Sequence, residues 1–190
     1  MIIKELPKDV EFMSLGTNCL ALTSNLITIK GPLDNVCAIS SKALSSILDN
    51  TYLKKLLETQ PNVEDIDFVG FYKKCYTWPN LDIAIVHNEY NLYYIKNHIK
   101  RLKNLYSRLQ DINTYFFLSI PFLGMVEDFK ILLEKYNLIN RTIVITDEIY
   151  KDEFPNVIPL KAFDGDPSFF VGPIFTERTE ELKQFLKSIN

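Results

Sequence analysis

The second half of the chain alternates short apolar runs with amphipathic stretches, and this alternation restricts the fold more than any other feature. The apolar runs have the length and residue types of buried strands, and they cover residues 81–86, 114–120, 142–146 and 157–160. In the amphipathic stretches apolar residues recur at helical spacing, and these stretches cover residues 92–109, 125–136 and 176–189. Strands joined through helices pair in parallel. We therefore predict an α/β fold, with a largely parallel sheet flanked by helices in three layers.

The first half predicts one more strand followed by helices. Residues 10–15 are apolar and end at Gly16, as a buried strand running into a tight turn would. Three helices are expected after it, from Asn18 to about Lys30, over residues 40–48, and from a Thr51 cap to Leu57. Residues 61–79 are too irregular for a strand or helix assignment. No linker or repeat divides the chain, so we expect one domain over residues 1–190.

Composition excludes two classes of partner. The formal net charge of −3 among 190 residues gives no field that would attract nucleic acid. The most apolar run, residues 115–126, contains Pro121 and Gly124 and is shorter than the ~20 residues of a membrane helix. The first residues lack the pattern of a secretory signal. We expect a cytoplasmic protein without a membrane span; the sequence leaves its oligomeric state open.

The three cysteines, Cys19, Cys37 and Cys75, match no zinc-binding spacing and read as free thiols. Cys19 differs from the other two because it follows the turn of Gly16 and opens the predicted helix. Unpaired backbone N–H groups and the helix dipole favour a thiolate at such a position. Cys19 is therefore a candidate nucleophile, with a small buried wall residue as the alternative.

His87 and Asp34 are the candidate partners of Cys19. His87 follows the strand predicted at residues 81–86, and the carboxyl ends of parallel strands gather functional groups. If that strand lies beside the first one, the imidazole can reach the thiol and act as its base. Asp34 is the carboxylate chosen to orient the imidazole. The alternatives are a His87 that caps a helix or is satisfied in the core, and an Asp34 that caps a helix or forms a turn.

Three further residues are candidates for an oxyanion hole or for substrate binding. Asn18 can offer its side-chain amide beside the Cys19 backbone N–H, or can simply cap the helix. Gly16 and Asn88 stand next to the candidate nucleophile and base in sequence and complete this group.

Other polar clusters are weaker candidates. The carboxylates of Asp147 and Glu148, and those of Asp164 and Asp166, follow apolar segments but are too few for a metal site on their own. His98 lies among basic residues of the long helix and is expected to be solvated. The phosphate-binding, dinucleotide-binding, zincin and serine-hydrolase motifs are not present in the sequence. No metal or cofactor is expected.

Two short motifs resemble a family of papain-like cysteine peptidases of unknown function. The first motif is residues 14–19, SLGTNC, and the second is residues 32–35, PLDN. The family has Ser-Leu-Gly-x-x-Cys, then Pro-Phe-Asp-Trp, then a histidine before a basic helix. Leu33 and Asn35 replace the family's aromatic residues, so the substrate pocket is expected to differ. The resemblance implies a Cys19, His87 and Asp34 arrangement, and it suggests an association with surface polysaccharides.

Three functional hypotheses follow. The first is a thiol-dependent hydrolase or acyl transferase acting on an ester, amide or peptide bond of a small-molecule, peptide or glycan-linked substrate. The second is a non-catalytic ligand-binding protein, with Cys19 in the wall of its crevice. The third is a transferase in surface-polysaccharide modification, with Lys100 or Arg101 holding a donor phosphate.

Overall fold

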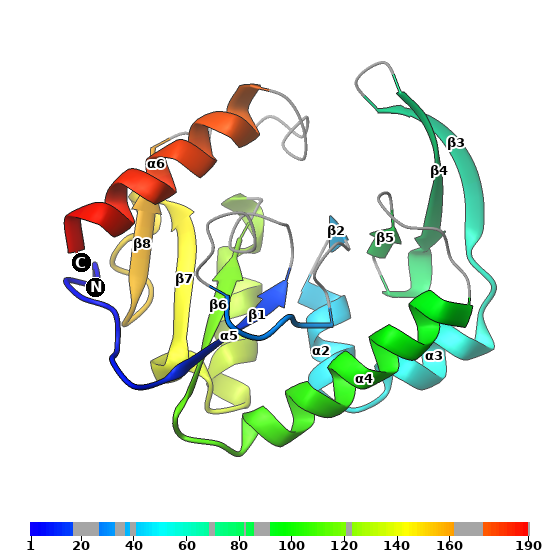
Figure 1. The fold of residues 1–190 in the computed structure, drawn as a ribbon, viewed down its shortest axis with the longest axis horizontal. Helices are drawn as coiled ribbons and strands as arrows, with labels where there is room; N and C mark the ends of the chain where they lie inside the picture. Colours follow the sequence, from blue (N-terminus) through cyan, green and yellow to red (C-terminus); the bar gives the residue numbers. More distant parts are fainter. Residues whose placement is uncertain are drawn as a thin grey trace.

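The computed structural model describes most of the chain, with two sheets and the helices around them (Figure 1). The described residues are 1–16, 27–32, 37–38, 41–68, 71–81, 83–85, 92–120, 123–161 and 173–189. They form a mixed α/β fold, as the alternation in the sequence predicts.

The first sheet is parallel and has four strands in the order β1-β6-β7-β8. Its strands are β1 (Glu11–Gly16), β6 (Thr114–Ser119), β7 (Thr142–Asp147) and β8 (Val157–Leu160). All four coincide, within a residue or two, with apolar runs predicted as strands. Because the strands are parallel, their carboxyl ends meet at one edge of the sheet.

Helices cover both faces of the parallel sheet. Alternate side chains point to opposite faces, since a strand has a period of two residues. On one face Phe117, Ile143 and Ile145 pack with Leu182 and Leu186 of α6 (Pro173–Ile189). On the other face Phe116 and Val144 are buried in a cluster with side chains of α5 (Val126–Lys135) and α2 (Ser41–Leu48). This confirms the predicted helix-flanked parallel sheet.

The second sheet is antiparallel, with four strands in the order β2-β5-β4-β3. Its strands are β2 (Cys37–Ala38), β3 (Asn62–Phe68), β4 (Phe71–Trp78) and β5 (Ile83–Ile85). β3 and β4 form a long hairpin, and β5 pairs only with residues 76–78 of β4. The hairpin therefore extends beyond the rest of the sheet as a two-stranded ribbon (Figure 1). The sequence predicted β5 as a strand but put it in the parallel sheet, which is wrong.

The remaining elements lie between the strands along the chain. They are α3 (Tyr52–Glu58), α4 (Leu92–Leu109) and the short 3-10 helices η1 (Pro79–Leu81), η2 (Leu123–Met125), η3 (Ile139–Arg141) and η4 (Glu148–Tyr150). Among them α4 leads from β5 of the second sheet to β6 of the first. Trp78, Leu81 and Ile83 are buried in the same cluster as Met13 and Phe116 of the parallel sheet. One apolar core therefore joins the second sheet to the first.

Two local predictions from the sequence are wrong. The helix expected up to Lys30 does not include residues 27–30, because Ile29 forms a parallel bridge with Met13 of β1 instead. Residues 17–26 lie outside the described residues. Thr51 precedes α3, but its hydroxyl donates to the Ser46 carbonyl oxygen (3.3 Å) rather than capping α3.

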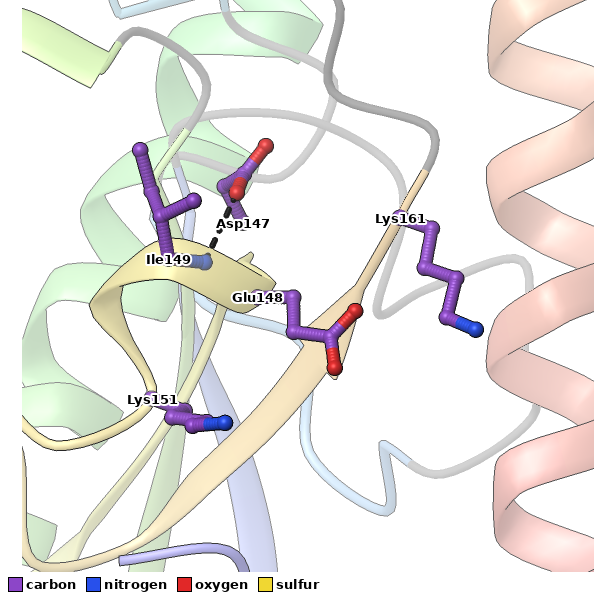
Figure 2. Close-up of a pocket in the computed structure, with 5 residues that line it drawn as sticks. All are labelled: Asp147, Glu148, Ile149, Lys151 and Lys161. Carbon is purple, nitrogen blue, oxygen red and sulfur yellow. Dashed lines mark hydrogen bonds between the residues drawn. The ribbon is translucent and has the colours of Figure 1, made fainter.

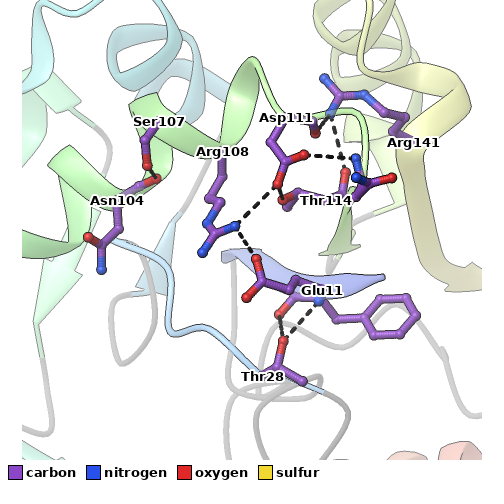
Figure 3. A network of polar contacts seen from close by, with 10 residues as sticks. Glu11, Thr28, Asn104, Ser107, Arg108, Asp111, Thr114 and Arg141 are labelled. Carbon is purple, nitrogen blue, oxygen red and sulfur yellow. Dashed lines mark hydrogen bonds and ion pairs between the residues drawn. The ribbon is translucent and has the colours of Figure 1, made fainter. Parts of the chain in front are cut away.

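A network of polar contacts holds the amino ends of β1, β6 and β7 together (Figure 3). Arg108 forms ion pairs with Glu11 at the start of β1 and with Asp111 in front of β6. The Asp111 carboxylate also accepts hydrogen bonds from the Asn113 N–H (3.0 Å) and the Thr114 hydroxyl (3.0 Å). These contacts join neighbouring elements at the edge opposite the carboxyl ends, which leaves the carboxyl edge as the place to look for a site.

Candidate functional site

The carboxyl edge of the parallel sheet is formed by Gly16, Ser119, Asp147 and Leu160, where the four strands end. Ligands of open α/β sheets bind outside this edge because the connecting loops form a crevice there. Ser119 is buried, and so is Thr146, the residue before Asp147. The edge thus combines polar side chains with the ends of four parallel strands.

β1 ends in a bulge that redirects the chain just before the Cys19 segment. Ser14 pairs with Phe117 and Gly16 with Leu118, so Leu15 is an extra residue in the ladder. Gly16 has a φ of 89°, in the left-handed region that favours glycine. Its N–H donates to the Ser14 hydroxyl oxygen at 2.9 Å. The described contacts therefore assign Gly16 a role in the turn, and its N–H is engaged within β1.

Residues 27–32 run beside β1 and return to the same edge. The N–H groups of Thr28 and Ile29 donate to the Phe12 carbonyl oxygen, each at 3.0 Å. A Cβ atom on Gly31 would lie 1.8 Å from the Ser14 carbonyl oxygen. Only glycine fits this approach, and it brings the Gly31-Pro32 turn against the last residues of β1.

The pairing of β2 with β5 provides a second anchor. Cys37 pairs with Ala84 and Ala38 with Ile83, in antiparallel register. This pairing joins the segment that follows Asp34 to the segment that precedes His87.

The structure describes one of the six candidate residues, Gly16. Cys19, His87, Asp34, Asn18 and Asn88 lie outside the described residues. The sequence argument for a Cys19–His87 approach assumed that their strands are neighbours in one sheet. That assumption is wrong, because β1 pairs with β6 while β5 lies between β2 and β4.

His98 is buried, contrary to the expectation that it is solvated. It is 3% exposed on α4, with the ring of Tyr52 at 5.2 Å and that of Tyr94 at 5.8 Å between centroids. Burial, together with the positive charge of Arg101, lowers the pKa of His98 from 6.5 to about 4. His98 is therefore neutral at pH 7 and belongs to the core between α3 and α4.

One pocket lies at the β7 and β8 end of the carboxyl edge (Figure 2). It has a volume of about 510 Å³ and is lined by Asp147, Glu148, Ile149, Lys151 and Lys161. The two carboxylates, at the end of β7 and the start of η4, are candidates from the sequence, whereas the two lysines are not. Lys161 directly follows β8, and its position at the carboxyl end of a parallel strand could have identified it as a candidate from the sequence.

Within the described residues there is neither a cluster of metal ligands nor a membrane-spanning helix. No three histidine, cysteine or carboxylate side chains in this part of the chain are grouped as metal ligands would be. No helix within the described ranges combines the length and the apolar character that crossing a membrane requires.

Comparison of the chain with protein-family models, with curated proteins and with solved structures gave no match.

Proposed function

We propose that this chain is a thiol-dependent hydrolase or acyl transferase in which Cys19 is the nucleophile, His87 its base and Asp34 the group that orients His87. The thiolate attacks the carbonyl carbon of an ester, amide or peptide bond, and the imidazolium returns the proton to the leaving group. Water, or an acceptor hydroxyl or amine, then cleaves the thioester. Asn18 and Asn88 are proposed to assist with side-chain amides at the oxyanion.

The observation that supports this proposal is the way described segments connect the three candidates. Cys19 is three residues beyond Gly16, and Gly31, three residues before Asp34, packs against Ser14. Three residues span at most ~11 Å when fully extended. The Cys19 and Asp34 segments therefore start from one contact at the end of β1.

The register of β2 and β5 supports the pairing of Asp34 with His87. Cys37 is opposite Ala84, Asp34 is three residues before Cys37, and His87 is three residues after Ala84. An antiparallel ladder continued by equal steps brings such positions opposite each other. We propose that Asp34 and His87 continue this register, which would let the carboxylate orient the imidazole.

The substrate is proposed to be a small molecule, a peptide or a glycan-linked acyl group, consistent with the resemblance to the cysteine peptidase family. A thiol nucleophile works in a reducing compartment, and we propose a cytoplasmic location.

The test is the pH dependence of iodoacetamide labelling at each cysteine, resolved by mass spectrometry, in wild type, His87→Ala and Asp34→Asn. Cys37 and Cys75 are internal references. We expect Cys19 to label with a midpoint well below that of an ordinary thiol, ~8.5, and to move towards it in His87→Ala. Thermal unfolding of each variant checks that it folds.

A Cys19 that labels like the other two cysteines overturns the catalytic proposal. The ligand-binding hypothesis would then replace it, since an inert Cys19 fits a wall residue. Hydrolysis of p-nitrophenyl acetate gives a second readout, because Cys19→Ala must remove turnover while Cys75→Ala retains it.

A further inference from the structure

The pocket beyond β7 and β8 has two carboxylates and two ammonium groups around one cavity (Figure 2). Asp147 is the last residue of β7 and Glu148 the first of η4, Lys151 follows η4, and Lys161 follows β8. A volume of about 510 Å³ falls within the range of small-molecule sites. The position is the edge where ligands bind in parallel sheets.

The four charged side chains do not pair with one another. Asp147 accepts a hydrogen bond from the Ile149 N–H (2.9 Å), and the other three described side chains form no hydrogen bond or ion pair. Elsewhere on the described surface opposite charges meet, as in Lys130 with Glu153 (2.8 Å) and Lys183 with Glu180 (2.7 Å). The pocket thus separates opposite charges that pair at comparable exposure elsewhere.

The backbone that carries these side chains is held in place. The Asp147 carboxylate fixes the start of η4 through the Ile149 N–H. The Lys161 N–H donates to a carboxylate oxygen of Glu181 on α6 at 2.7 Å. Both sides of the pocket are therefore positioned before any ligand arrives, which lowers the entropic cost of binding.

We propose that this pocket binds a zwitterion of the amino-acid or peptide class. The ligand ammonium lies against the carboxylates of Asp147 and Glu148, and its carboxylate lies against one of the two lysines, which flank Glu148 (Figure 2). A purely anionic ligand would meet two carboxylates, and a purely cationic ligand two ammonium groups, so each would be repelled by half of the lining. A ligand that carries both charges is complementary to both kinds of charge among the described lining residues.

The site does not depend on the chemistry of Cys19. β7 is two strands away from β1 in the sheet order, which corresponds to ~10 Å between strand axes. The described residues of the pocket follow or end β7 and β8, so ligand binding there is tested independently of Cys19.

The test is an NMR titration of ¹⁵N-labelled protein with three matched probes: triglycine, N-acetyltriglycine and triglycinamide. They share a backbone and differ in charge, since the first is a zwitterion, the second an anion and the third a cation. We expect triglycine to shift the amide signals of Ile149 and Lys161 and to bind at least ~3-fold more tightly than the other two, as expected for one additional exposed charge contact.

Variants of the pocket identify which side chain contacts the ligand ammonium and which contacts the ligand carboxylate. Glu148→Gln should reduce triglycine affinity ~3-fold and should not weaken N-acetyltriglycine, because the acetylated probe has no ammonium for Glu148 and is repelled by its carboxylate. Lys161→Gln should weaken triglycine and N-acetyltriglycine but not triglycinamide. Glu58→Gln and Lys54→Gln, on the exposed surface of α3, are the matched controls and should change nothing.

A fourth probe, glycine, distinguishes a free amino acid from a peptide as the ligand. The ammonium and carboxylate groups of glycine are separated by a single carbon atom, so binding equal to that of triglycine favours free amino acids, and weaker binding favours peptide ends. The proposal is overturned if triglycine leaves the pocket amides unshifted, or if either singly charged probe binds as tightly as triglycine.

Discussion

The guanidinium of Arg141 donates a hydrogen bond of 2.8 Å to the carbonyl oxygen of Leu109, the last residue of α4. The same group donates to the carbonyl oxygens of Asp111 (2.6 Å) and Thr114 (3.3 Å). A cation at a helix C-terminus satisfies carbonyl groups that have no partner inside the helix. Arg141 thus joins the end of α4 and the start of β6 to its own position in front of β7 (Figure 3).

Arg141→Ala should lower the free energy of unfolding by about 2 kcal/mol, because it leaves three carbonyl groups without their charged donor. Arg141→Lys should be intermediate, since an ammonium keeps the charge but not the fork of donors. Urea unfolding of the three proteins measures this order. A Lys variant as unstable as the Ala variant would contradict the role of the charge.

Asp111 should make the free energy of unfolding depend on pH in the acid range. The Asn113 N–H, the Thr114 hydroxyl and Arg108 lower the pKa of Asp111 below 3.8 in the folded chain. A depressed carboxyl pKa stabilises the fold above 3.8, and this contribution is lost as the pH falls through the folded pKa. The stability difference between wild type and Asp111→Asn should therefore be constant near neutral pH and shrink below 3.8. Urea unfolding at pH 7 and pH 3 checks it, and an unchanged difference at pH 3 would refute it.

Gly31 should tolerate no side chain. A Cβ atom there would overlap the Ser14 carbonyl oxygen at 1.8 Å, while a Cβ on Gly124 meets nothing within 4 Å. Gly31→Ala should cost about 2 kcal/mol of unfolding free energy because backbone on both sides must shift. Gly124→Ala is the matched control and should cost less than about 0.5 kcal/mol. Equal losses in thermal unfolding would show that residues 27–32 do not need the close approach.

His98 should destabilise the fold in mild acid. Its pKa is about 4 in the folded chain and 6.5 without burial. The unfolded chain therefore takes up the proton first, and stability falls as the pH drops from 6.5 to 4. At pH 5 the loss relative to pH 7 is about 2 kcal/mol from this one group.

His98→Phe keeps an aromatic ring between Tyr52 and Tyr94 but has nothing to titrate. The variant should lose less stability than wild type between pH 7 and pH 5. Lys96→Gln, on the exposed side of the same helix, should behave like wild type. An NMR titration that places the His98 midpoint near 6.5 would contradict the burial argument.

Thr142 and Thr146 are two buried threonines on β7 that differ in whether the hydroxyl group is hydrogen-bonded. The Thr142 hydroxyl donates to the Leu138 carbonyl oxygen (2.8 Å), whereas the Thr146 hydroxyl has no hydrogen-bond partner within the described structure. Replacing Thr146 by Val should stabilise the fold by about 1 kcal/mol, because it removes an unsatisfied polar group without changing shape. Thr142→Val should destabilise it by a similar amount. Thermal unfolding distinguishes the two, and a destabilised Thr146→Val would point to a polar partner in the native protein.

The elements that could be predicted from the sequence are those whose burial imposes a regular pattern. β6, β7 and β8 are buried on both faces and read as apolar runs, and α4 has an apolar stripe from Leu92 to Leu109. The β3–β4 hairpin could not be assigned because its apolar residues recur irregularly, and because beyond residues 76–78 its two strands pair only with each other. Its strands therefore show neither strand nor helix periodicity.

Long-range packing explains what the sequence missed at the sites. His98 has basic neighbours along α4, and only its contact with Tyr52 of α3 shows that it is buried. Asp147 and Glu148 are adjacent in sequence and were noticed, whereas Lys161 joins their pocket only through the pairing of β7 with β8. The sequence thus pointed to one side of the pocket and not to the other.

The placement of β1 has a consequence for how the molecule assembles. Glu11 of β1 pairs with Thr114 of β6, and the whole antiparallel sheet lies between them in the chain. β6, β7 and β8 follow one another closely and can pair early, whereas closing a loop of ~100 residues to add β1 carries a larger entropic cost. We expect the last step of folding to be the docking of β1. That step also creates the turn at Gly16, so the candidate nucleophile segment is completed only when the rest of the sheet already exists.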